Sequence, residues 1–144
     1  IVCDLYGGVG LFTMPITKKI GNEGHVHLVE ISNHSARDAF KIFKDYNNVS
    51  IHRGSVDRKL PKINNIDIII LDPPRSGAGK KVIGQIISKK PRAVVYISCD
   101  PASLARDAKF LYDSGYKLDK IKAVDLFPMT HHIECIVRFI PSTN

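Results

Sequence analysis

The chain has 144 residues, which is enough for one domain with a hydrophobic core and too few for two ordinary ones. Hydrophobic residues make up 44% of it and charged residues 24%, a composition that excludes a disordered or collagen-like chain. Lys and Arg number 21 against 14 Asp and Glu, which gives a formal charge of +7 and favours a polyanionic partner, whereas no apolar run approaches the roughly 20 residues that span a bilayer.

The basic residues form short doublets, at Lys18-Lys19, Lys80-Lys81 and Lys89-Lys90, and a solvated surface has the same pattern. The three cysteines lie far apart, without the paired spacing of zinc sites or the density of secreted disulfide scaffolds. We therefore predict a reducing compartment, the cytoplasm, and propose no metal. Because the chain opens on a strand without a start methionine, we expect it to be part of a longer protein.

Short apolar runs alternate with helical stretches, which predicts strand–helix–strand units around a mostly parallel sheet. Asp67–Leu71 contains four consecutive apolar residues and is expected at the centre, buried on both faces. The last two segments, Tyr116–Asp125 and His131–Ile140, are expected to pair antiparallel, with Phe127-Pro128 at the bend. The remaining strands are expected at Ile1–Leu5, Val26–Glu30, Val49–His52 and Ala93–Ile97.

Helices are expected between the strands, on both faces of the sheet. Asp100 can cap the last of them, with Pro101 at its first position and Gly115 near its end. The others are expected from about Leu11 to Ile20, behind an Asn33 cap with an apolar face of Ala36, Ala39, Phe40 and Phe43, and over Val82–Ile87. This is a doubly wound α/β layer structure, in which ligands bind beyond the carboxyl ends of the strands.

A glycine-rich loop, Asp4–Gly10, follows the first strand and lets the backbone approach a ligand closely. Glu30 ends the next strand, where a carboxylate can accept the ribose hydroxyls of a nucleoside cofactor. Thr13 replaces the third glycine of the dinucleotide-binding pattern, which weakens a pyrophosphate-binding interpretation. The alternative is a tight structural turn beside a surface glutamate.

Asp72-Pro73-Pro74-Arg75 follows the most hydrophobic strand, and its prolines stiffen the backbone. Here Asp72 could hold a planar base by its edge and Arg75 could contact phosphate. The alternative is a rigid loop without a ligand.

Cys99 lies between a strand and a capped helix, near backbone N–H groups that favour its thiolate, the nucleophilic form. The alternative is inert packing, which we expect for Cys3 and Cys135 inside their strands. Glu134 lies in an otherwise apolar strand, where burial or a nearby charge could make it a working base. Its alternative is an edge-strand glutamate that faces water. The adjacent His131 and His132 would point to opposite faces and make a poor metal pair.

Taken in order, these motifs resemble the RNA 5-methyluridine methyltransferases, which use S-adenosylmethionine to methylate carbon 5 of uracil in tRNA or rRNA. The likeness spans nearly the whole chain. It is carried by Asp4–Phe12, Val29-Glu30-Ile31, Leu71–Arg75, Ser98-Cys99-Asp100-Pro101 with Leu104-Ala105-Arg106-Asp107, and Asp125-Leu126-Phe127-Pro128 with His132-Ile133-Glu134.

The resemblance implies one Rossmann-like class I methyltransferase domain over residues 1–144, with upstream RNA-binding modules outside the chain. Ser55 stands where the family often has an acidic residue that contacts adenine. The resemblance also implies cofactor contacts from Tyr6, Gly8, Gly10, Glu30, Ser55 and Asp72, target contacts from Asp72, Pro73 and Arg75, a Cys99 nucleophile that attacks carbon 6, and a Glu134 base.

Other functions stay open at this point. A nicotinamide-dependent oxidoreductase shares the sheet and the acidic strand end but leaves Cys99 and Glu134 without a role. An amino-directed nucleic-acid methyltransferase needs no thiol, and its related loop has Tyr where Arg75 stands here. A domain that only binds cofactor or RNA is the third alternative.

Overall fold

The computed structural model describes residues 1–125 and 133–142, and over these residues one sheet of seven strands has the order β3-β2-β1-β4-β5-β7-β6. Neighbours among β1 to β5 are parallel, whereas β7 runs antiparallel to both β5 and β6. The predicted fold class, a mostly parallel sheet with an antiparallel C-terminal pair, is confirmed. The strands are β1 (Val2–Leu5), β2 (Val26–Glu30), β3 (Val49–Arg53), β4 (Ile68–Leu71), β5 (Ala93–Ser98), β6 (Tyr116–Val124) and β7 (Glu134–Pro141).

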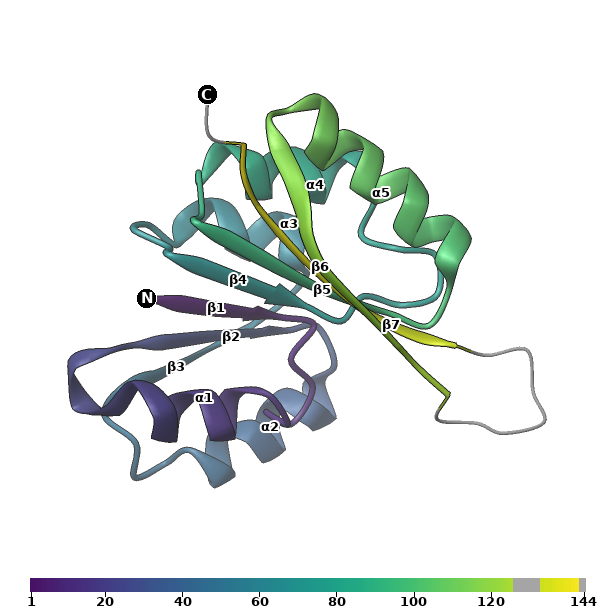
Figure 1. Cartoon of the computed structure of the whole chain (residues 1–144). Coiled ribbons are helices and arrows are strands. Elements are labelled where there is room, and N and C mark those ends of the chain that lie inside the picture. The colour runs from purple at the N-terminus through teal and green to yellow at the C-terminus, as the bar shows by residue number, and fades with distance from the viewer. Residues whose placement is uncertain (126–132, 143–144) are drawn as a thin grey trace.

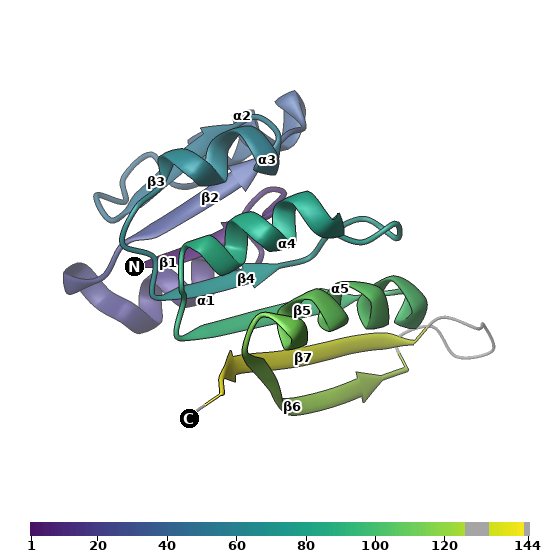
Figure 2. The same ribbon diagram turned by 90° about the horizontal axis from the view of Figure 1, so that it is seen from above.

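Helices lie on both faces of the sheet (Figures 1 and 2). α1 (Thr13–Ile20) and α2 (Asn33–Ile42) lie on one face, whereas α3 (Val56–Lys59), α4 (Gly79–Ser88) and α5 (Pro101–Asp113) lie on the other. The sequence analysis missed α3 and the short 3-10 helices at Gly21–Glu23 and Leu60–Lys62, because helices of three or four residues show no periodicity. The predicted bend at Phe127-Pro128 lies outside the described residues.

β4 is the central strand, as predicted, but it is not buried on both faces. Ile69 and Leu71 are fully buried in the larger hydrophobic core, under α3, α4 and α5. Ile68 and Ile70 point to the opposite face and are only partly buried, because α1 and α2 cover mainly the β1–β3 side of that face. The apolar run therefore predicted the position of the strand in the sheet but overestimated the cover on one side.

The details of α2 differ from the prediction in two places. Ser32 is the cap residue, with extended backbone and a side chain that accepts the N–H of Ser35, whereas Asn33 is already helical. Ala39 and Phe43 pack against Leu28 in a second, smaller core, but Phe40 is 51% exposed. An adjacent position on a helix turns about 100° away from its neighbour, which takes Phe40 off the buried face.

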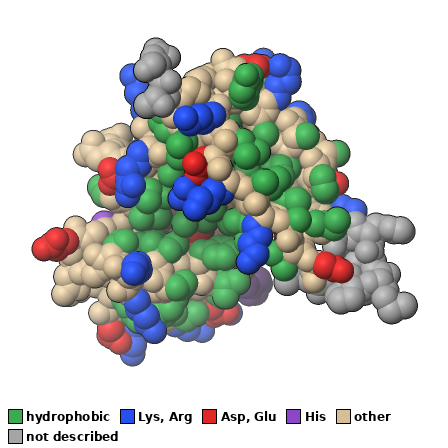
Figure 3. Space-filling model, viewed as in Figure 1, with side chains coloured by type: hydrophobic (Ala, Val, Ile, Leu, Met, Phe, Trp, Pro, Cys, Tyr) green, Lys and Arg blue, Asp and Glu red, His purple; other side chains and the backbone are tan. Residues whose placement is uncertain are grey.

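The surface carries many cations without one dominant block. On the face seen in Figure 3, Lys and Arg side chains are scattered among apolar and neutral groups. No helix in the described part of the chain has the length and apolar character needed to cross a membrane.

Candidate functional site

The predicted site residues converge on one edge of the sheet. The parallel strands all end there, and β1 is in register with both neighbours, since Leu5 pairs with Val29 and with Leu71. β7 runs the other way and therefore begins at this edge, where Cys135 pairs with Ser98. The topology thus gathers the groups predicted from separate motifs: Tyr6, Glu30, Asp72, Cys99 and Glu134.

The loop after β1 has the backbone of a ligand-binding turn. Tyr6 has φ 61°, a left-handed conformation that bulky residues rarely adopt. Gly8 has φ 56°, and a Cβ added there would point into open space, so a ligand can approach its backbone. Gly10 has φ 100°, and a Cβ there would overlap the ring of Phe43. The two glycines therefore have different roles, one toward open space and one toward the core.

Glu30 is locked in place by two backbone N–H groups. Its Oε2 accepts the N–H of Gly8 at 2.9 Å and its Oε1 accepts that of Ser32 at 2.6 Å. The residue is only 8% exposed, so it is not the surface glutamate of the alternative interpretation. Each carboxylate oxygen keeps a further lone pair, which leaves Glu30 able to accept hydroxyl groups from a ligand.

Asp4 is a buried carboxylate of β1, next to this loop, that the sequence analysis did not single out. Thr13 donates its hydroxyl to Oδ2 at 2.6 Å, whereas Oδ1 has no hydrogen-bond partner among the described residues. Burial raises the pKa of Asp4 to about 6, and the nearby charges of Asp72 and Glu30 add to the rise. Thr13 is the residue that could have pointed to Asp4, because its hydroxyl donates to that carboxylate. The sequence analysis considered Thr13 only as the replacement of the third glycine in the dinucleotide-binding pattern.

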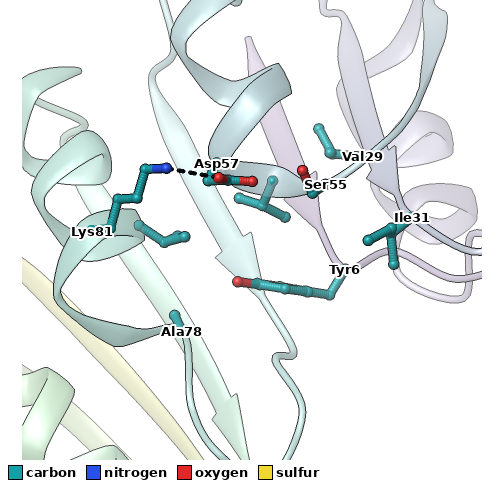
Figure 4. Close-up of a pocket in the computed structure, with 9 residues that line it drawn as sticks. Tyr6, Val29, Ile31, Ser55, Asp57, Ala78 and Lys81 are labelled. Carbon is teal, nitrogen blue, oxygen red and sulfur yellow. Dashed lines mark hydrogen bonds and ion pairs between the residues drawn. The ribbon is translucent and has the colours of Figure 1, made fainter.

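A pocket of about 260 Å³ opens beside the loop (Figure 4). Tyr6 points across it toward α4, below Ser55 and Asp57. Asp57 forms an ion pair with Lys81 at 2.8 Å, and hydrogen bonds from Lys81 and Ser55 lower the pKa of Asp57 to about 2. The wall of the pocket thus has Ser55, as predicted, together with a carboxylate at position 57 that the sequence analysis missed. The pocket is lined by Tyr6, Val29, Ile31, Ser55, Val56, Asp57, Ala78, Lys81 and Val82.

Asp72 lies at the end of β4, where its backbone N–H donates to the carbonyl of Leu5. It is an exposed residue, yet partial burial of its carboxyl group and the negative charge of Glu134 raise its pKa. Pro73 behind it is buried, whereas Arg75 is exposed and lies near enough to Asp100 to help lower the pKa of that carboxyl group, after the hydrogen bonds from Ser103.

Cys99 occupies a tight turn between β5 and α5. Asp100 caps the helix by accepting the N–H of Ser103 at 2.7 Å, and its own N–H donates to Ser98 Oγ at 3.1 Å. Cys99 is half-buried, whereas Cys3 and Cys135 are buried in their strands, as predicted, and burial raises the pKa of the Cys3 thiol. The turn therefore keeps one of these three thiols accessible at the edge.

Glu134 is the first residue of β7 and is half-buried. Because Cys135 pairs with Ser98, the last residue of β5, Glu134 lies level with Cys99 in the turn that follows. β7 lies between β5 and β6, so the alternative of an edge-strand glutamate is wrong. His131, His132 and the segment 126–132 lie outside the described residues. Over residues 1–125 and 133–142, no group of His, Cys, Asp or Glu side chains has the arrangement of a metal site.

Comparison with known proteins points to one family. A family model described as tRNA (Uracil-5-)-methyltransferase matches residues 2–140. An uncharacterized RNA methyltransferase of Streptomyces avermitilis is 43% identical over 98% of this chain, which covers 33% of that protein. The chain thus spans about a third of the length of such relatives.

Solved structures agree with this family and with the fold. The tRNA (uracil-54, C5)-methyltransferase of Pyrococcus abyssi, solved with S-adenosyl-L-homocysteine, has a TM-score of 0.83 and 30% identity, over 96% of this chain and 34% of its own. The precorrin-6y C5,15-methyltransferase of Geobacter metallireducens has a TM-score of 0.79 at 13% identity, over 96% of this chain and 78% of its own, and shows the fold alone.

Proposed function

Because the chain belongs to the tRNA (uracil-5-)-methyltransferase family, we propose that it is the catalytic domain of an enzyme that methylates carbon 5 of a uridine in RNA. The observation that carries the proposal is the convergence of Cys99, Asp72 and Glu134 at the sheet edge, beside the glycine loop and its pocket. An oxidoreductase or an amino-directed methyltransferase would leave the accessible thiol and the glutamate next to it without a role.

The first half of the edge fits S-adenosylmethionine, which supplies an electrophilic methyl group when bound. Gly8 offers backbone without a side chain, and Glu30 keeps lone pairs for the ribose hydroxyls. Tyr6 and Ser55 line the pocket that we assign to the adenine. Gly10 acts indirectly, through its contact with Phe43.

The second half supports covalent catalysis at uracil. Carbon 5 is a weak nucleophile, so we propose that the Cys99 thiolate adds to carbon 6 and places the electrons of the double bond at carbon 5. After methylation, Glu134 takes the proton from carbon 5, the double bond forms again, and the Cys99 sulfur leaves. Asp72, which is close enough to Glu134 for the charge of Glu134 to raise its pKa, would hold the edge of the base. Pro73 would pack against the base, and Arg75 would contact a phosphate.

The substrate in this proposal is tRNA or rRNA, whose target base must be turned out of its stack to reach the edge. The net charge of +7 assists backbone binding without selecting a sequence. We propose that residues 1–144 form a single domain and that the remainder of the longer protein selects the RNA. The free thiols of Cys3, Cys99 and Cys135 support a reducing compartment, the cytoplasm.

If the remainder of the protein selects the RNA, residues 1–144 alone should bind RNA weakly. In a gel shift at equal salt, we expect the full-length protein to bind RNA much more tightly than residues 1–144. Equal affinities would contradict the assignment of RNA selection to the remainder of the protein.

The decisive test uses the full-length protein, S-adenosylmethionine and RNA that carries 5-fluorouridine. Fluorine leaves no proton for Glu134 to remove, so a covalent complex should persist on a denaturing gel, with the crosslink at Cys99 by mass spectrometry. Cys99→Ala should give no complex. A wild-type protein that methylates ordinary RNA but never forms the complex would rule out the covalent route.

A further inference from the structure

One buried carboxylate on α5 holds the loop between β4 and α4. Asp107 is 0% exposed, in the middle of the helix. Its Oδ2 accepts the backbone N–H groups of Ala78 at 2.8 Å and Gly79 at 3.1 Å, together with the hydroxyl of Tyr96 at 2.8 Å. A buried carboxylate with three donors on one oxygen is a fixed point for the segment that supplies them.

Arg106 extends this contact along the loop. Its guanidinium donates to Asp107 Oδ1 at 2.9 and 3.1 Å and to the carbonyl of Ser76 at 2.8 Å. Gly77 lies against the pair with φ 80°, and a Cβ there would be 2.5 Å from Arg106 Nη2 and 2.7 Å from Asp107 Oδ2. The loop therefore packs against the Arg106–Asp107 pair at Gly77, where any larger residue would overlap the two side chains.

Asp107 also replaces a local cap for α4. That helix starts at Gly79, with Ala78 as the cap residue and no side-chain cap of its own. The first N–H groups of a helix need acceptors and attract negative charge. A carboxylate from the neighbouring helix thus fixes the start of α4, the helix that carries Lys81 and Val82 into the pocket wall.

The loop connects both halves of the proposed site. At its start, Asp72 is close enough to Glu134 for the charge of Glu134 to raise its pKa, and Arg75 is similarly coupled to Asp100 beside Cys99. At its end, Ala78 lines the pocket. Asp72 is held at the sheet by its own N–H bond to the carbonyl of Leu5, whereas the contacts of Arg106 and Asp107 hold the other end of the loop, beyond Arg75.

We propose that Asp107 is a positioning residue of the methyl-transfer reaction, because it fixes residues 76–79 and thereby the end of the loop that carries Arg75 beside the Cys99 turn and Ala78 into the pocket wall. This inference rests on the proposed function for its catalytic consequence, whereas the fixing of the loop is independent of it. A misplacement of about 1 Å in a reacting geometry lowers a rate on the order of 100-fold, so the effect should be measurable.

The test compares Asp107→Asn with Asp113→Asn in the full-length protein. Asp113 lies on the same helix, is exposed and pairs with Lys109, so it controls for the loss of one charge. Hydrogen exchange followed by mass spectrometry should show faster exchange at Ala78 and Gly79 in Asp107→Asn alone, with the strands unchanged. Tyr96→Phe, which keeps the carboxylate and removes one donor, should give a smaller increase and serves as the milder variant.

The catalytic readout is the rate of the Cys99 complex with 5-fluorouridine RNA. We expect Asp107→Asn to slow it by roughly 10- to 100-fold even when S-adenosylmethionine is saturating. Unchanged exchange at Ala78 and Gly79, or faster exchange throughout the domain, would overturn the positioning role. A wild-type protein that neither methylates RNA nor forms the complex would refute the proposed function, and hydrogen exchange would still decide whether Asp107 fixes the loop.

Discussion

The two halves of the sheet edge are built in different ways. At the β1–β2 half, shape is fixed by backbone, since Gly8 donates to Glu30 and Gly10 packs on Phe43. At the β4–β5–β7 half, the groups that we propose for catalysis are the partly exposed side chains of Cys99 and Glu134, which the fold brings together from distant segments. Recognition of a common cofactor needs a fixed surface, whereas chemistry on a base needs reactive side chains that it can reach. The predictions below test this division, from the largest expected effect to the smallest.

Replacement of Cys99 should have the largest effect, because it should abolish the chemistry and leave cofactor binding unchanged. Cys99→Ala should lower methyl incorporation into RNA by at least about 1,000-fold, because the route through carbon 6 is lost. Calorimetry should find the same affinity for S-adenosylmethionine as in the wild type. A variant that kept substantial activity would point to amino-directed methylation instead.

Glu134→Gln should stop the reaction at a later stage. Removal of a general base lowers a rate by about 100- to 10,000-fold, and here the proton on carbon 5 would stay in place. The methylated RNA should then remain attached to Cys99 and migrate with the protein on a denaturing gel. If turnover falls but no attached RNA accumulates, Glu134 acts before the methyl transfer and our assignment fails.

Asp4 should make the stability of the folded chain depend on pH. Its pKa rises from 3.8 to about 6 on folding, so the folded chain binds the proton more tightly and loses stability as the pH rises through that window. The shift corresponds to about 3 kcal/mol, fully developed near pH 7. Asp4→Asn should remove this slope and be the more stable protein at neutral pH in urea unfolding. Parallel stability curves for the two proteins between about pH 4 and 7 would contradict this account.

Gly8→Ala and Gly10→Ala form a matched pair within one loop. Both residues have positive φ, which makes alanine unfavourable by about 1 kcal/mol, but only the Gly10 methyl would overlap Phe43. Gly10→Ala should therefore lower the unfolding temperature further, whereas Gly8→Ala should mainly weaken cofactor binding. Equal losses of stability would show that the contact with Phe43 is easily relieved.

The sequence predicted the sheet well because buried strands have short apolar runs and the helices between them have periodic apolar faces. The strand Val26–Glu30 and the Asp100 cap were predicted as observed. The predicted burial of Phe40 and of the far face of β4 was wrong. Burial depends on which other elements pack on a surface, and periodicity in the sequence does not encode that packing.

The candidate site was predictable where its residues form continuous motifs. Asp57 was missed because no local pattern pointed from Ser55 to a carboxylate two positions later. Asp107 was noticed only as part of a motif, because its partners Ala78 and Tyr96 lie far from it in the chain. Roles that depend on contacts between distant segments need the fold before they can be assigned.

The left-handed backbone of Tyr6 shows that this residue is held against its local preference. A glycine here would relieve about 1 kcal/mol of backbone strain, but it would also remove a ring that packs against the larger core. The same exchange would remove the aromatic wall that crosses the pocket in Figure 4. Packing and the shape of the pocket thus depend on one side chain, and variants selected for heat resistance should keep it.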